Sequence, residues 1–156
     1  MKATGNQLNR GLNMENLIKV LETAAAVDEL DTVIGFVDEQ LETAGCPMNV
    51  QLQIELAVEE IFVNIASYAY APGTGNATIK VGISGDPLTA EITFMDSGVQ
   101  YDPLAKDDPD ITKPAEERDI GGLGIFLTKK NMDEVAYEYR DGMNVFTMKK
   151  VIAPEP

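Results

Sequence analysis

The sequence predicts an α+β two-layer sandwich, in which one mixed, mostly antiparallel sheet is covered on one face by helices. Two observations lead to this fold class. Apolar residues recur at helical spacing in the first half of the chain, whereas in the second half they alternate with polar residues between turn signals. The length of 156 residues suits one domain with a sizeable core. The expected order is β, α, α, β, β, a long loop, α, β, β.

The chain is expected to begin with a leader and a short strand. Residues 1–14 are polar, and we expect them to form a flexible leader, which places the single domain at residues 15–152. The segment NLIKVLE, residues 16–22, predicts the first strand.

Two helices are predicted to follow. Apolar side chains recur at helical spacing within residues 27–45, and Gly45 is a candidate C-terminal cap. Residues 49–73 form the second predicted helix, which Pro72 would end. The apolar positions that support the first helix are Leu30, Val33, Val37, Leu41 and Ala44.

Alternation of apolar and polar residues then predicts two hairpins. Residues 77–84 and 88–96 each place their apolar side chains on one face, and the Gly-Asp-Pro segment at 85–87 is typical of a turn. Residues 134–152 predict a second hairpin, because the Asp-Gly pair at 141–142 is a strong turn signal.

A long polar segment separates the two hairpins. From Ser97 to Ile120 the chain is charged and contains Pro103, Pro109 and Pro114. Structureless loops of this length are uncommon in compact domains and often act as lids or binding loops. A disordered surface insertion is the alternative, and this segment alone does not decide between them.

Composition excludes several classes of function. The chain has no histidine, which removes imidazole-based triads, the usual zinc sites and any autophosphorylated histidine. The single cysteine, Cys46, cannot form an internal disulfide. A net charge of −14 argues against a nucleic-acid partner and favours cations or a basic protein surface. We expect a cytoplasmic protein, because no apolar run has the length of a membrane span and the N-terminus does not resemble a signal peptide.

The second predicted helix carries the first candidate site. On a helical wheel, Glu60 and Asn64 lie on a thin polar stripe between a broad and a narrow apolar arc, whereas Glu55 and Glu59 are expected to face solvent. A carboxylate and an amide one turn apart can face one site, which suits a general base beside a Mg²⁺ ligand. The alternative is a polar seam between helices, and the stripe by itself favours that interpretation.

The second candidate site lies at the end of a predicted strand. Asp96 falls on the same face of the predicted strand as the apolar residues before it, because side chains alternate between the two faces of a strand. Its carboxyl group is therefore expected to point into the core. A buried carboxylate there could accept a hydrogen bond from an amino group such as that of adenine, and Gly98 would let a flat ring approach the backbone. A simple Asp-Ser-Gly turn is the alternative.

The third candidate site is a glycine-rich turn, with Gly121, Gly122 and Gly124 immediately before an apolar, helix-like run. It is neither a Walker A loop nor a dinucleotide fingerprint. Free amides at a helix N-terminus favour an anion such as phosphate. A flexible hinge that closes the long loop is the alternative, although a helix start does not require three glycines.

Taken together, in this order and at these spacings, the three sites resemble the N, G1 and G2 boxes of the Bergerat (GHKL) ATPase fold. The resemblance is closest to the small, single-domain branch, the bacterial anti-sigma factor/serine-protein kinases, and it covers roughly residues 15–152. The segments that carry it are LAVEEIFVNIASYAY (56–70), DSGVQYDP (96–103) and GGLGIFLTKKNMDEVAYEY (121–139).

This resemblance implies a role for each motif. Asn64 would coordinate a Mg²⁺ ion that bridges the phosphates, and Glu60 would be the general base toward a seryl hydroxyl or a water. Asp96 would accept from the adenine amine, with Gly98 packed near the ring. The segment 97–120 would be the ATP lid.

The glycine-rich motif would hold the phosphates. Arg118, in the implied lid, is a candidate phosphate or partner contact. The residues implied to bind phosphate are Gly121, Gly122, Leu123, Gly124 and Ile125.

Several positions depart from the family pattern. Gln100 replaces a glycine that often follows the G1 box, and Tyr68 stands where many relatives carry histidine. The threonine that often supports adenine after the last hairpin glycine is absent, because Met143 and Asn144 follow Gly142. Asn144 is a candidate to substitute for that threonine through a water.

The resemblance implies an ATP- and Mg²⁺-dependent protein serine kinase. It would phosphorylate an anti-anti-sigma (STAS-type) protein and sequester a sigma factor, and a homodimer is a further expectation. The departures motivate an alternative, a nucleotide-responsive regulatory binding module without kinase turnover. The catalytic domain of a histidine kinase ranks last, because the chain has no histidine to phosphorylate.

Overall fold

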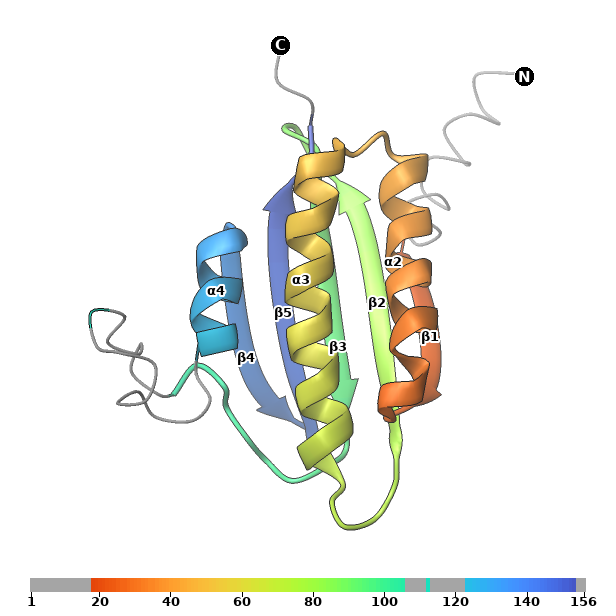
Figure 1. Cartoon of the computed structure of the whole chain (residues 1–156), viewed down its shortest axis with the longest axis vertical. Helices are drawn as coiled ribbons and strands as arrows, with labels where there is room; N and C mark the ends of the chain where they lie inside the picture. The colour runs from red at the N-terminus through yellow and green to blue at the C-terminus, as the bar shows by residue number, and fades with distance from the viewer. Residues whose placement is uncertain (1–17, 106–111, 113–122, 154–156) are drawn as a thin grey trace.

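The structure, a computed structural model, describes residues 18–105, 112 and 123–153. Within these residues five strands form one sheet, and three α-helices lie on one of its faces (Figure 1). The predicted α+β sandwich is therefore confirmed, whereas the predicted leader at 1–14 lies outside the described residues. In chain order the elements are β1 (Ile18–Ala24), α2 (Leu30–Thr43), α3 (Met48–Asn64), β2 (Asn76–Ser84), β3 (Thr89–Asp96), α4 (Leu123–Asn131), β4 (Glu134–Arg140) and β5 (Met143–Val151).

Two helices differ from their predicted lengths. The first predicted helix begins with a short 3-10 turn at Val27–Glu29, so that α2 starts only at Leu30. The second changes character after Asn64, where a single π-helical turn at Ile65–Ala69 replaces the α-helix. Single π turns inside helices are frequent at functional sites, because they redirect the side chains and carbonyl groups that follow.

The sheet is built from hairpins and has the strand order β1-β2-β3-β5-β4. All four pairings between the described strands are antiparallel, so the parallel component that a mixed sheet allows does not occur among them. The β4–β5 turn has positive φ at Asp141 (54°) and Gly142 (77°), the geometry that an Asp-Gly pair favours. In the β3–β5 register Asp96 lies opposite Asn144.

The core lies between the sheet and the helices. Helix α3 runs over the centre of the sheet, with α2 over the β1–β2 side and α4 over the β4 side (Figure 1). Burial of each large apolar side chain in this layer contributes roughly 1.5–3 kcal/mol, which fixes α3 in place. The fully buried large residues include Val33, Val37 and Leu41 of α2, Ile54, Val58 and Phe62 of α3, and Ile79, Val81, Ile92, Phe94 and Met148 of the sheet. No helix in the described part of the chain is long and apolar enough to cross a membrane.

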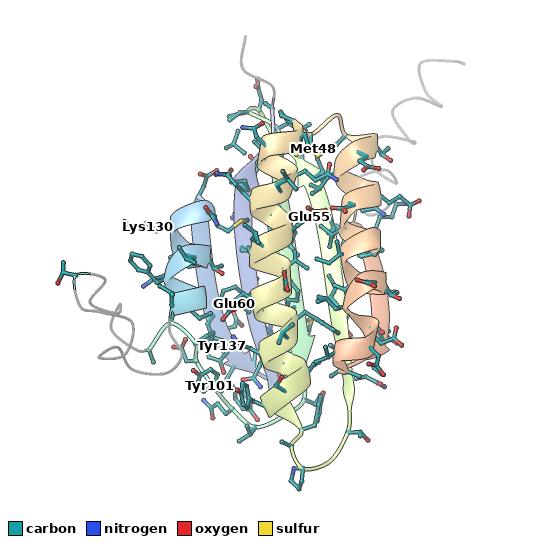
Figure 2. The ribbon with its side chains drawn as sticks, in the orientation of Figure 1. Met48, Glu55, Glu60, Tyr101, Lys130 and Tyr137 are labelled. Atoms are coloured by element: carbon teal, nitrogen blue, oxygen red, sulfur yellow. The ribbon has the colours of Figure 1, made fainter. Side chains whose placement is uncertain are left out.

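The outward face of α3 differs from the prediction in one respect. Glu55 does not face open solvent but lies against Asp38 of α2, whereas Glu59 is exposed as expected. The side of α3 that faces solvent carries Leu52 and Leu56, which are 52% and 60% exposed. The reason is that α3 packs between α2 and α4. Glu55 lies on the side of α3 that faces α2, and Glu60 lies on the side that faces α4 (Figure 2).

Candidate functional site

A cavity of about 600 Å³ opens between the C-terminal end of α3, the ends of β3 and β5, and the start of α4. Cavities of this size suit a drug-sized or cofactor-sized ligand. Its lining is mainly apolar, with Glu60 and Asn64 from α3, Asp96 from β3 and Asn144 from β5 among the polar residues. The structure thus brings residues of the first two predicted sites, which are distant in sequence, onto one cavity, together with Ile125 of the third.

Glu60 and Asn64 are hydrogen-bonded neighbours. Asn64 Nδ2 donates to Glu60 Oε1 over 3.0 Å, as the one-turn spacing on α3 allows. Because the amide nitrogen is engaged, the side-chain oxygen of Asn64 is the atom left to accept or to coordinate. Both side chains are half-buried at the cavity wall.

The side-chain oxygen of Asn64, beside the Glu60 carboxylate, fits a Mg²⁺ ion that is also bound by phosphate. Among the residues that the structure describes, no group of three or more acidic, histidine or cysteine side chains could hold a metal alone. Mg²⁺ is usually held by one or two protein oxygen ligands together with waters and substrate phosphates. The donor set therefore fits a metal–nucleotide complex better than a dedicated metal site.

The π-helical turn after Asn64 anchors the segment that follows β3. The Ala69 carbonyl accepts a hydrogen bond from Val99 N over 2.8 Å. A Cβ atom at Gly98 would overlap the Ala69 backbone, so only glycine allows this approach. Packing against Ala69 therefore requires glycine at position 98, which the sequence did not reveal. The predicted approach of a flat ring would be a second reason for glycine here.

Asp96 is buried at the end of β3, as its parity predicted, with an exposed fraction of only 4%. Its Oδ1 atom accepts from Gly98 N at 2.9 Å and from Asn144 Nδ2 at 2.9 Å. These bonds stabilise the carboxylate inside an otherwise apolar wall. Asp96 also lines the cavity, where it can accept a hydrogen bond from a ligand.

Asn144 is the centre of the polar network around Asp96. Besides Asp96, its Nδ2 contacts the Val99 carbonyl at 3.0 Å, and its Oδ1 accepts from Tyr101 N at 3.1 Å and from the Tyr137 hydroxyl at 2.5 Å. The sequence made Asn144 a candidate to support adenine through a water, which stays a prediction; the structure shows that Asn144 also contacts Asp96 directly. The strand parity that placed Asp96 could also have placed Asn144, since the two are opposite each other in the register.

Sequence reasoning missed Tyr137. Desolvation by burial raises the pKa of its hydroxyl above the usual value, and nearby Asp102 and Asp96 act in the same direction, against the Tyr101 backbone hydrogen bond. The hydroxyl therefore stays protonated near neutral pH and can donate to Asn144. Figure 2 shows Tyr137 and Tyr101 close to one another, on the same side of α3 as Glu60.

The third predicted site is described only in part. Helix α4 begins at Leu123, and the Gly124 backbone lies so close to Glu60 that a Cβ atom would overlap its carboxylate. Ile125 lines the cavity and is 8% exposed, whereas Leu123 is 39% exposed. Outside the described residues lie Gly121, Gly122, Arg118 and all of the predicted lid after residue 105 except Thr112.

The described cavity wall is acidic. It carries Glu60 and Asp96, and none of the described lining residues is lysine or arginine. An anionic ligand would therefore depend on backbone amides, on a bound cation or on groups beyond the described wall. The wall can therefore provide a buried acceptor, Asp96, and the carboxylate–amide pair Glu60–Asn64.

The chain is similar to several known proteins. Residues 23–150 match the histidine kinase-like ATPase domain family. The chain is 34% identical over 102 residues to the serine-protein kinase RsbW of Bacillus cereus (strain B4264), a match that covers 63% of this chain and 62% of that protein. It is 29% identical over 102 residues to the serine/threonine-protein kinase BtrW of Bordetella bronchiseptica, covering 65% of this chain and 71% of that protein.

A solved structure supports the fold. The RsbU and RsbW domains of a Mycobacterium tuberculosis protein superpose on this chain with a TM-score of 0.61 at 16% identity. The superposition covers 88% of this chain and 33% of that one. At this identity the likeness is one of fold.

Proposed function

Because this chain belongs to the histidine kinase-like ATPase domain family, we propose that it is an ATP-dependent protein serine kinase that also acts as an anti-sigma factor. In this proposal it works in the cytoplasm, phosphorylates an anti-anti-sigma (STAS-type) protein and binds a sigma factor, as a homodimer. The names of the two kinases to which it is similar support the reaction class.

One observation carries the proposal most directly. The cavity of about 600 Å³ is lined by a buried acceptor, Asp96, and by the hydrogen-bonded pair Glu60–Asn64. A nucleotide has the complementary arrangement, with an amino group on its base and a metal-binding triphosphate at its far end. The start of α4 lies beside Glu60, where backbone amides at a helix N-terminus favour phosphate.

The proposed reaction moves the γ-phosphoryl group to a serine. The serine Oγ attacks the γ-phosphorus, the bond between that phosphorus and the β,γ-bridging oxygen breaks, and ADP leaves. Glu60 accepts the proton of the seryl hydroxyl, and Asn64 orients the Glu60 carboxylate through their hydrogen bond. Mg²⁺, bound to the phosphates and to Asn64, would neutralise the charge that develops.

The test is a transfer assay. The protein is incubated with γ-labelled ATP, Mg²⁺ and the cognate STAS-type protein, and the label is located by mass spectrometry. We expect transfer to a serine, and a loss of at least about a hundredfold in the Glu60→Ala variant, as removal of a general base typically causes. A wild-type protein that binds ATP but transfers nothing would contradict the kinase proposal.

A second candidate function is a nucleotide-responsive binding module without turnover. It is favoured by the described cavity wall, which has no basic side chain, and by Gln100, Met143 and Asn144, where the sequence departs from the pattern of the family it resembles. Calorimetric titration with ATP, ADP and Mg²⁺ separates the two. Tight binding of both nucleotides, with no phosphoryl transfer to the STAS-type protein over hours, supports the binding module.

A further inference from the structure

The side-chain amide of Asn144 can adopt only one orientation in this network. Its Oδ1 faces the backbone N–H of Tyr101 at 3.1 Å, and a backbone N–H can only donate. Its Nδ2 faces the backbone carbonyl of Val99 at 3.0 Å, which can only accept. If the amide were flipped, its NH₂ group would face the Tyr101 N–H and its oxygen would face the Val99 carbonyl oxygen, and neither pair could form a hydrogen bond. The two backbone groups therefore fix the orientation of the amide.

Tyr137 adds a third constraint on the same amide. Its hydroxyl donates to Asn144 Oδ1, and a tyrosine hydroxyl is protonated near neutral pH, so it stays a donor. Asn144 is itself 7% exposed, so water does not replace these partners readily. Three groups from two separate segments, the residues after β3 and strand β4, therefore hold one side chain in one direction.

The fixed amide determines what Asp96 can do. Asp96 Oδ1 receives the Asn144 Nδ2–H and the Gly98 N–H, both at 2.9 Å, and neither donor can reverse its role. Two donors on one oxygen hold the carboxylate in one orientation, because both bonds would be lost if it turned. Within the described residues both hydrogen bonds that Asp96 accepts end on Oδ1, which leaves Oδ2 for a ligand.

We infer that Asn144, held by Tyr137, is a positioning residue that fixes the orientation of the Asp96 carboxylate, directs Oδ2 as an acceptor at the base and so restricts the cavity to purines with a 6-amino group. The inference rests on the proposed function, in which a nucleotide base binds at Asp96. A 6-oxo purine such as hypoxanthine presents a carbonyl oxygen at the same place. Two acceptors then face each other, and both lose their hydrogen bonds to water.

The arrangement makes a specific prediction for Asp96→Asn. Asn144 and Gly98 still donate to the oxygen at position 96, so the new amide must turn its NH₂ group toward the ligand. An acceptor becomes a donor at the point that contacts the base. Nucleotide preference should then change from ATP toward inosine triphosphate. The change should be smaller in the double variant Asp96→Asn/Asn144→Ala, because Asn144 no longer donates to the oxygen at position 96 and so no longer helps to orient the new amide there.

The experiment measures dissociation constants for ATP and inosine triphosphate, each with Mg²⁺, by calorimetry on the full chain. The two nucleotides differ only at the purine edge, so their ratio reports recognition of the base rather than general stability. The variants are Asn144→Ala, Tyr137→Phe, Asp96→Asn and the double variant Asp96→Asn/Asn144→Ala, with Tyr139→Phe as the matched control. Tyr139 lies on the same strand and is 42% exposed, and circular dichroism checks that each variant folds.

We expect the wild type and Tyr139→Phe to prefer ATP by at least about tenfold, as a site with a matched hydrogen bond does. Tyr137→Phe, which removes a single hydroxyl, should reduce this preference several-fold, and Asp96→Asn should reverse it. If Asn144→Ala does not fold, Tyr137→Phe and Asp96→Asn still decide the question.

Two negative results have different meanings. If the wild type prefers ATP but Tyr137→Phe and Asn144→Ala keep the same preference within about twofold, the positioning role is wrong and the proposed function stands. If the wild type binds neither nucleotide, the proposed function is wrong, and the inference falls with it.

Discussion

Gly124, at the start of α4, lies directly against the carboxylate of Glu60 on α3, and a Cβ atom at this glycine would occupy the space of the carboxylate. The contact joins the first predicted site to the last. It places the N-terminal turn of α4 beside the carboxylate–amide pair of the cavity. The glycine at this position therefore sets where the carboxylate of Glu60 can lie.

Gly124→Ala should displace the Glu60 carboxylate without unfolding the protein, because the atoms that would clash are the end of a flexible side chain. We expect serine phosphorylation to fall by at least about tenfold, since a misplaced base is costly. Thermal denaturation should show no loss of stability, because alanine is the better helix former.

Gly35→Ala is the matched control, because a Cβ atom at Gly35 in α2 would meet nothing within 4 Å. It should raise the free energy of unfolding by about 0.5–1 kcal/mol and leave the rate unchanged. Equal rates for both variants would show that Gly124 does not position Glu60.

Asn64→Ala removes the donor to Glu60 Oε1 and the amide oxygen that we assign to Mg²⁺. ATP affinity should then lose most of its dependence on Mg²⁺, which titrations with and without the metal measure. Asn49→Ala, an exposed position in the first turn of the same helix, should keep that dependence. An unchanged Mg²⁺ dependence in Asn64→Ala would exclude Asn64 as a ligand.

Gly98→Ala should destabilise the fold, because the added Cβ atom meets the rigid Ala69 backbone instead of a mobile side chain. Overpacking of this kind costs about 1–3 kcal/mol, which urea denaturation would report. Gly82→Ala in β2 is the control, since its Cβ would lie at an ordinary 3.4 Å from the Ile18 side chain. Weak ATP binding with wild-type stability would instead show that Gly98 serves the ligand.

Asp38→Asn should change how stability depends on pH. Burial raises the pKa of Asp38 from 3.8 to about 7, with further contributions from Glu55 and Glu42 that outweigh the opposing hydrogen bond from Gln51. Between pH 3.8 and about 7, Asp38 is therefore protonated in the folded state and ionised in the unfolded state. Wild-type stability should therefore fall as pH rises from about 4 to 7 and stay low above 7.

The asparagine variant lacks this titration, so it should be more stable than the wild type at pH 8 by roughly 1–2 kcal/mol, reduced from the full linkage value by solvent screening. Near pH 4 the difference should nearly vanish. Urea denaturation at both pH values measures it, with the exposed Asp31→Asn of the same helix as control. An equal gain at both pH values would contradict the assignment to Asp38.

Much of the fold followed from patterns that depend only on the local sequence. Strand parity placed Asp96 in the core, and the Asp-Gly pair at residues 141–142 determined the last turn. The helical spacing of Glu60 and Asn64 brought their side chains together as expected. These features are set by backbone periodicity, which a sequence shows directly.

The rest depends on packing between segments, which periodicity does not contain. The wheel of α3 could not reveal that α2 would cover Glu55 while Leu56 stayed exposed. The contact of Gly98 with Ala69 depends on a π-helical turn that the sequence did not indicate. Tyr137 was missed because its partner, Asn144, is seven residues away across a hairpin.

The central claim is that the cavity holds a nucleotide, with its base at Asp96 and its phosphates near Glu60 and Asn64. A crystal structure with Mg²⁺ and a non-hydrolysable ATP analogue tests it most directly. We expect the adenine amine within hydrogen-bond distance of the Asp96 carboxylate, and the phosphates between Asn64 and the start of α4. A base bound away from Asp96, or an empty cavity at saturating analogue, would contradict the account.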